Sequence, residues 1–383
     1  MQPSTPSQPP PTSGEGPTPI VKSPTLSKRA ELFIKIAIAI ISPLLLIGLL
    51  EGAAYIWERG QANDIYAWEL VASRRLDFVQ YTQPDPGYTL MVPNSSYKWQ
   101  GIPVEINDKG LRTPETSYKK LSNTFRILNV GDSIAMGWGV REEETYGQQL
   151  EDLLNQQTDN SITYEVINAG VPGWNPANAL AYLQAEGMMY EPDLILFDLT
   201  IPNDIYGKSA LVAHERPPLI EWLRANTYFW PFLTIQLRWI EARSQGRDRI
   251  AVIDPPIDAA SYFPLELEDQ QYQKIWASLE AMHQLAQQNN AHFALLLFPL
   301  EFQVLDKNYP TTPQEFFTAK AAEAGFPALD LLPVFQQACL ERAGGTCRLE
   351  DRHLFADVWM HPSAYGHELV AQEILSSIIS PVD

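Results

Sequence analysis

The sequence has little cysteine and a shortage of basic residues, and both exclude classes of function. Only two of 383 residues are cysteine, Cys339 and Cys347, and their spacing fits no zinc-binding pattern. Lysine and arginine number 27 against 46 aspartate and glutamate residues, which gives a net charge of −19. Nucleic-acid binding needs a basic surface, so this class of function is excluded. The sequence implies no metal and no nucleotide cofactor.

The cysteine pair leaves two states open. Cys339 and Cys347 would form a short-loop disulfide if this part of the chain lies outside the cytoplasm. Two free or buried thiols fit the sequence equally well, because spacing alone does not decide pairing.

Charged residues are absent from most of the stretch Ile36–Trp57, which is long enough to cross a bilayer. We expect a disordered, proline-rich cytoplasmic tail over residues 1–29 and a transmembrane signal-anchor helix over 30–58. Basic residues lie before or at the entry to the apolar stretch: Lys22, Lys28, Arg29 and Lys35. Glu51, Glu58 and a single Arg59 mark its exit. The positive-inside rule therefore places everything after Trp57 outside the cytoplasm.

Two other interpretations of this stretch are weaker. A cleaved signal peptide would have a shorter apolar core nearer Met1, although Gly52-Ala53-Ala54 offers a cleavage site. A buried globular helix would carry polar residues along one face, and this run is too uniformly apolar for that. An uncleaved membrane anchor is the favoured interpretation.

Beyond the anchor, the pattern predicts a linker and small β-rich lead-in over 59–124, followed by an α/β domain over 125–383. Five apolar runs of strand length are found: Arg126–Val130, Tyr164–Asn168, Leu194–Leu199, Phe293–Phe298 and Ala328–Leu332. Amphipathic segments of helix length separate most of them: Gly147–Gln157, Asn178–Gly187 and Gln270–Gln288. Such alternation predicts a mostly parallel sheet with helices on both faces.

An insertion at about 206–262 interrupts this alternation. Its segment Pro217–Arg243 mixes six aromatic residues with arginines. We expect helices that pack their aromatic side chains on the domain. Contact with a membrane surface, or an acyl or sugar subsite, is the alternative.

Candidate catalytic residues follow the predicted strands. Gly131-Asp132-Ser133 closes the first strand, where open α/β sheets place their chemistry and where a helix N-terminus would stabilise negative charge. The loop Asn168–Asn175 follows the second strand, and the Gly173 amide there is a candidate oxyanion donor. Asn203 follows the third strand as a second donor. A simple turn and an Asx turn are the competing interpretations of these two loops.

A serine nucleophile needs a base, and the base needs an acid that fixes its tautomer. His361 with Asp357 offers both near the C-terminus, ahead of an amphipathic helix that runs through Ile379. His353 beside Asp351 is the alternative pair.

Taken in chain order, Ser133, Gly173, Asn203 and His361 with Asp357 make the chain resemble the SGNH (GDSL-type) hydrolase family over about residues 126–380. The resemblance implies a flavodoxin-like three-layer α/β/α sandwich with a five-stranded sheet. It implies Ser133 as nucleophile, His361 as base and Asp357 as acid. Ser133, Gly173 and Asn203 would form the oxyanion hole.

Two departures from the family pattern stand out. The family usually spaces its acid and histidine as Asp-x-x-His, whereas three residues separate Asp357 from His361. Asp351 and Glu350 are therefore substitutes for the acid. The family commonly has glycine ahead of Asn-Asp in the third block, where this chain has Pro202. The lead-in segment Ile106–Arg112 resembles one in membrane-anchored members, which are often associated with bacterial cell-surface polysaccharides.

We therefore expect a membrane-anchored serine esterase that cleaves esters, in particular acetyl esters on cell-surface carbohydrate, through an acyl-serine intermediate. The same residues would serve an O-acyltransferase if a sugar hydroxyl displaced water. A non-catalytic module for polysaccharide binding or assembly is the alternative from another class.

Overall fold

The computed structural model describes residues 27–60, 81–85, 87–99, 102–157, 162–201, 204, 218–244, 264–305, 308–342, 353–356 and 360–379. Most of the predicted tail, the ends of the predicted insertion and Cys347 lie outside these residues. The chain separates into two compact units, Met1–Ala53 and Ala54–Asp383.

Helix α1 spans Lys28–Gly60 and extends slightly beyond the predicted 30–58. Its segment Lys28–Trp57 is long and apolar enough to cross a membrane, as an anchor or as a signal sequence. At 1.5 Å per residue, a helix of this length exceeds the roughly 30 Å of a bilayer's hydrocarbon core.

The second unit is built on a five-stranded sheet with the strand order β6-β5-β7-β8-β9, in which every neighbouring pair is parallel. The strands are β5 (Thr124–Gly131), β6 (Thr163–Gly170), β7 (Leu194–Thr200), β8 (His292–Phe298) and β9 (Ala328–Asp330). This confirms the predicted parallel sheet and its five strands. Strand β5 lies between β6 and β7, so the strand order reverses at its carboxyl end, where open sheets bind ligands.

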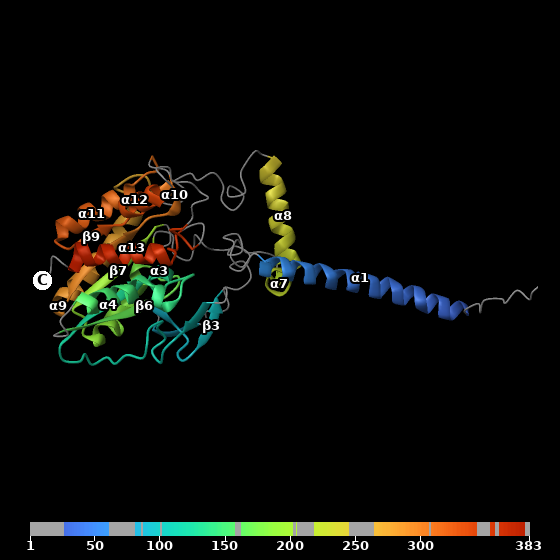
Figure 1. Cartoon of the computed structure of the whole chain (residues 1–383), viewed down its shortest axis with the longest axis horizontal. Coiled ribbons are helices and arrows are strands. Elements are labelled where there is room, and N and C mark those ends of the chain that lie inside the picture. The colour runs from blue at the N-terminus through green and yellow to red at the C-terminus, as the bar shows by residue number, and fades with distance from the viewer. Residues whose placement is uncertain are drawn as a thin grey trace, which may run out of the picture. The chain divides into compact units, whose positions relative to one another are not determined.

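Helices cover both faces of the sheet (Figure 1). One layer holds α4 (Tyr146–Gln157), α12 (Leu332–Arg342) and α13 (Ala364–Ile374), with α13 packed against both of the others. The other layer holds α5 (Pro176–Ala185), α9 (Gln270–Gln288) and α11 (Thr312–Ala324), with α9 between α5 and α11. The shorter helical segments are α3 (Ser133–Met136), η2 (Glu142–Glu144), η3 (Gly187–Tyr190), α10 (Glu301–Leu305) and η7 (Leu375–Ile379).

The lead-in forms two antiparallel hairpins that belong to the core of the unit. These are β1 (Tyr81–Asp85) with β2 (Tyr88–Met91), and β3 (Ser96–Trp99) with β4 (Ile102–Glu105). The Trp174 indole Nε1 donates to the Thr89 carbonyl at 2.8 Å, and the Asn178 amide donates to the Gly87 carbonyl at 2.7 Å. Buried side chains of β2 thus pack against α5 and the loop that precedes it.

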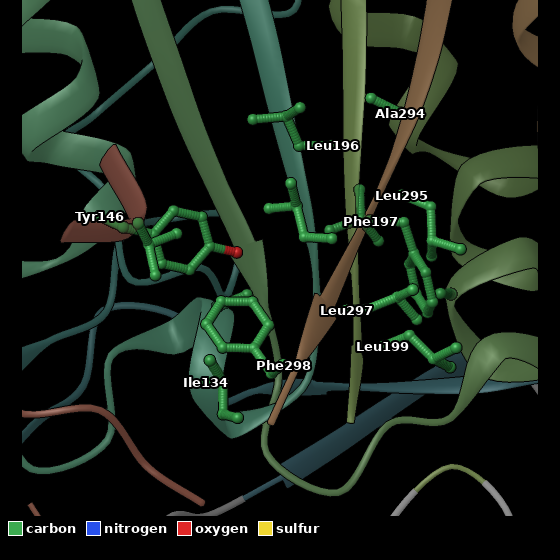
Figure 2. Packing of buried hydrophobic residues seen from close by; sticks show 14 of the residues in the cluster. Ile134, Tyr146, Leu196, Phe197, Leu199, Ala294, Leu295, Leu297 and Phe298 are labelled. Atoms are coloured by element: carbon green, nitrogen blue, oxygen red, sulfur yellow. The ribbon is translucent and has the colours of Figure 1, made fainter. Parts of the chain in front are cut away.

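Side chains alternate across the sheet, as the period of two in a strand requires. Figure 2 shows Tyr146, Ile134 and Phe298 on one side of β7 and β8, with Leu199 and Leu297 on the other. The Tyr146 and Phe298 rings lie 5.7 Å apart. Asp198 has the same parity as Leu196, so its carboxyl group belongs to the face that carries Ile134 and Tyr146.

The described part of the predicted insertion is helical, with α7 over Pro218–Asn226 and α8 over Phe229–Ser244. Some of its large apolar side chains are exposed: Leu219, Trp222, Leu237 and Ile240. The packing of its aromatic side chains on the domain stays a prediction.

Two glycines allow close packing where β5 and β6 end. One faces the Asp198 carboxyl group and the other faces α3. Gly131 and Gly170 pair across β5 and β6. A Cβ on Gly131 would lie 1.1 Å from the Asp198 Oδ1 atom, and a Cβ on Gly170 would lie 2.2 Å from the Met136 amide nitrogen. Neither position has room for a side chain, so both glycines are required by close approach.

We predict that Gly131→Ala destabilises the full chain by about 3 kcal/mol or more, because the added methyl group overlaps a buried carboxylate. Thermal unfolding in detergent measures the effect. Gly147→Ala in α4 is the matched control, since its Cβ would lie 3.3 Å from Val166 Cγ1 and its helical backbone favours alanine. Equal losses of stability in the two variants would contradict the close approach at Gly131.

Candidate active site

Ser133 lies at the start of α3, directly after β5, and its side chain is buried. Its Oγ atom is 2.8 Å from His361 Nε2. The structure thus brings together two residues that are 228 positions apart in the sequence. His361, and not His353, is the histidine at Ser133.

The turn that carries Ser133 is held by two carboxyl groups. Asp132 caps α3 by accepting the Ile134 amide hydrogen at 2.8 Å. Asp198 accepts hydrogen bonds from the amides of Asp132 at 3.2 Å and Ala135 at 3.0 Å. Among the described residues, the Ser133 amide has no hydrogen-bond acceptor. This amide is therefore available to donate a hydrogen bond to a group that binds next to the Ser133 hydroxyl.

Burial raises the pKa of the Asp198 carboxyl group well above its ordinary value, and the nearby Asp132 carboxylate raises it further. Burial likewise raises the pKa of Asp204, with smaller effects from Asp132 and Asp198. Asp198 and Asp204 therefore retain protons to higher pH than exposed aspartates do.

The loop that contains Gly173 is joined to β5, because the Val171 amide donates to the Gly131 carbonyl at 3.0 Å. Gly173 has a φ of +81° and open space where a Cβ would stand. Asn175 then caps α5 by accepting the Ala177 and Asn178 amide hydrogens. Pro172 and Gly173 form a turn, and the Val171 contact places this turn beside the end of β5. The role of the Gly173 amide as an oxyanion donor stays a prediction.

Asn203 lies outside the described residues. Asp204 is buried, and its carboxyl group accepts the Thr200 amide hydrogen at 2.6 Å. This contact joins Asp204 to the last residue of β7. Asp357 and its substitutes Asp351 and Glu350 also lie outside the described residues.

His361 is buried and held by its backbone and its ring. Its carbonyl accepts the Ala356 amide hydrogen at 2.7 Å, and Phe355 pairs with Pro362 in a short antiparallel bridge. The Trp138 ring stacks on the imidazole at 5.8 Å with an interplanar angle of 29°. The Trp138 amide in turn donates to the Ser133 carbonyl at 2.9 Å, so one loop contacts both residues.

A second histidine, His367, lies fully buried in α13. Its Nδ1 atom accepts the Tyr146 amide hydrogen at 3.2 Å, and its ring stacks on Tyr146 at 5.6 Å. Burial lowers its pKa to about 3, with smaller effects from Arg112 and His361. His367 is therefore neutral in the folded protein at ordinary pH and supports the backbone at the start of α4.

Among the described residues, no group of three or more histidine, cysteine, aspartate or glutamate side chains could hold a metal ion. Cys339 is buried in α12. Cys347, with which the sequence left a disulfide open, lies outside the described residues.

The sequence model of the GDSL-like Lipase/Acylhydrolase family matches residues 130–369, a segment that includes Ser133 and His361. The chain belongs to this family. It is therefore a hydrolase that acts on ester bonds. No curated protein matches the chain by sequence.

Several solved structures resemble this GDSL-like hydrolase at low identity. An acetyl xylan esterase, AlAXEase, is 17% identical over 66% of this chain and 100% of its own, with a TM-score of 0.41. The psychrotrophic esterase EstA from Pseudoalteromonas sp. is 18% identical over 68% and 99%, with a TM-score of 0.37. An acetylxylan esterase from Geobacillus stearothermophilus is 16% identical over 67% and 95%, with a TM-score of 0.39.

We predict that acid destabilises this GDSL-like hydrolase partly through His367. A histidine whose folded-state pKa is lowered contributes stability above its unfolded pKa, near 6.5, and that stability is lost as the pH falls toward 3. One such group costs about 2 kcal/mol between pH 6.5 and 4.5.

His367→Asn keeps an acceptor for the Tyr146 amide and removes the titration. Urea unfolding at both pH values measures the change, and the difference between the two proteins isolates His367 from the aspartates. An equal loss of stability in wild type and variant would show that His367 is not the acid-sensitive group.

Proposed function

We propose that this GDSL-like hydrolase cleaves acyl esters with Ser133 as nucleophile and His361 as general base. The hydrogen bond of 2.8 Å between Ser133 Oγ and His361 Nε2 carries the proposal. Proton transfer requires this contact, and the contact joins two segments that are far apart in the sequence.

The reaction would proceed in two halves. Nε2 of His361 takes the Ser133 hydroxyl proton as Oγ bonds to the ester carbonyl carbon. The alcohol then leaves with that proton, and an acyl-serine remains. Water next attacks the acyl carbon while His361 takes a water proton. The acid leaves, and Ser133 regains its proton from His361.

The negative charge on the carbonyl oxygen needs donors that are already in place. We assign this role to the Ser133 amide, the Gly173 amide and the Asn203 side chain. The first of these has no acceptor among the described residues, and the second lies in a turn tied to the end of β5. We assign the orienting acid to Asp357, which stands four residues before His361.

The proposed substrate is an acetyl ester on a carbohydrate. A small acyl group would suit a nucleophile whose side chain is only 7% exposed. The indole of Trp138 beside His361 offers an aromatic face of the kind that packs against sugar rings.

Ser133→Ala is predicted to abolish both labelling by a fluorophosphonate and hydrolysis of an aryl acetate by the full chain in detergent. Asp357→Asn should lower kcat by about 10⁴-fold, because the histidine loses its tautomer partner. Ser377→Ala, in the exposed part of the last helical segment, is the control and should retain wild-type rates. Labelling without hydrolysis would favour an acyltransferase, and the absence of both in folded protein would favour a binding module.

We further propose that α1 is an uncleaved anchor that holds the catalytic unit outside the cytoplasm. We predict that the full chain stays in the membrane pellet after carbonate extraction and keeps its N-terminal epitope tag. External protease should degrade the catalytic unit of intact spheroplasts. Recovery of a soluble chain cut near Ala54 would contradict anchoring, and protection from protease would contradict the orientation.

A further inference from the structure

The lead-in segment Ile106–Arg112 places a buried arginine against the loop that follows α3. Asn107 shapes the turn, because its side chain accepts the amide hydrogens of Lys109 at 2.9 Å and Leu111 at 3.0 Å. Gly110 has a φ of +76°, and a Cβ there would lie 2.5 Å from the Met91 carbonyl oxygen. These contacts fix the backbone of the turn. Arg112, which ends this segment, is only 1% exposed.

The Arg112 guanidinium binds backbone carbonyls of the loop after α3. Nη1 donates to the carbonyls of Met136 at 3.1 Å and Gly137 at 2.6 Å. Nη2 donates to Val140 at 2.9 Å and more weakly to Pro103 at 3.4 Å. Among the described residues, no carboxylate lies within salt-bridge distance of it.

Burying this cation is expensive. Desolvation of an ion costs several kcal/mol in a protein interior, and burial lowers the pKa of Arg112. The fixed fork of the guanidinium offsets this cost because it binds several carbonyls at once, which the single ammonium of a lysine does less well.

The loop that Arg112 holds joins both reacting residues. Helix α3 has only four residues, and a single turn is not stable without outside contacts. Carboxyl groups hold its N-terminal amides, and Arg112 holds the carbonyls at its C-terminal end, which matches the helix dipole at both ends. The same loop carries Trp138, whose ring stacks on His361.

We propose that Arg112 is a positioning residue, which fixes the loop Met136–Val140 so that Ser133 and His361 remain in hydrogen-bonding register. This role rests on the proposed function of Ser133 and His361. It places a residue of the lead-in, ahead of the first strand of the parallel sheet, among the supports of the reaction.

Arg112→Lys tests this role, with Arg126→Lys as its matched control. Arg126 is also 1% exposed and donates to the carbonyls of Tyr118 and Tyr190, but it lies near the start of β5, away from Ser133. In the full chain in detergent, well below the unfolding temperature, Arg112→Lys should lower kcat for an aryl acetate about 10- to 100-fold. KM should change less than about threefold, and Arg126→Lys should retain the wild-type kcat while losing thermal stability.

Amide hydrogen exchange of the peptide that contains Ser133–Val140 gives a readout that does not need turnover. Exchange should accelerate in Arg112→Lys and not in Arg126→Lys. Wild-type kcat in Arg112→Lys, or equal losses of kcat in both variants, would overturn the positioning role. If the wild type itself shows no turnover that depends on Ser133, the proposed function fails, and unchanged exchange in Arg112→Lys would then also refute the hold on the loop.

Discussion

The hydrogen bonds from the amides of Asp132 and Ala135 to the Asp198 carboxyl group hold the turn that carries Ser133 in place. They depend on the register of β5 with β7, which pairs Val130 with Phe197 and so sets Asp198 beside Gly131. The absence of a side chain at Gly131 lets the carboxyl group reach the amides. Strand pairing at the carboxyl end of β5 thereby helps to place Ser133 Oγ within hydrogen-bonding distance of His361 Nε2.

Buried polar groups of β5, α4 and α13 form a second set of contacts near Ser133 and His361. Tyr146 donates its hydroxyl hydrogen to Asn129 at 2.7 Å, and His367 Nδ1 accepts the Tyr146 amide hydrogen, so these contacts join β5, α4 and α13. Buried polar groups cost stability unless they are paired. Their presence here restricts how α13 can pack, and α13 follows His361 closely in the chain. The position of His361 is thus restricted by the packing of α13 as well as by its own loop.

Much of the fold could be predicted from sequence because the central strands are buried on both faces. Ile127 and Leu128 of β5 and Ile195 of β7 are fully buried, and the apolar runs that contain them indicate strands by composition alone. Strand β7 begins at Leu194, as predicted. The predicted fifth strand was two residues too long. Its apolar run continues through Leu332, but the Asp330 side chain accepts the Leu332 amide hydrogen and starts α12.

The candidate site was only partly accessible from sequence. Ser133 and His361 stand in recognisable motifs, whereas Asp198 is one acidic residue inside an apolar strand, and its partners are chosen by strand register. That interruption of an apolar run is the signal that marks it as buried and paired. Arg112 lies in the segment Ile106–Arg112, which resembles one in membrane-anchored family members. Its contacts with the loop after α3, however, follow from tertiary packing. No local pattern encodes such a contact.

The separation of the reacting residues along the chain has a consequence for biogenesis. The lead-in hairpin of β1 and β2 contacts Trp174 and Asn178, which lie 85 and 91 positions after their partners Thr89 and Gly87. Ser133 and His361 are separated by 228 positions. Contacts so distant in sequence form late, because long loops must close first. As the chain is synthesised from its N-terminus, Ser133 is made early, and it meets His361 only when the C-terminal segment packs on the sheet. The proposed reaction therefore requires an almost completely folded catalytic unit.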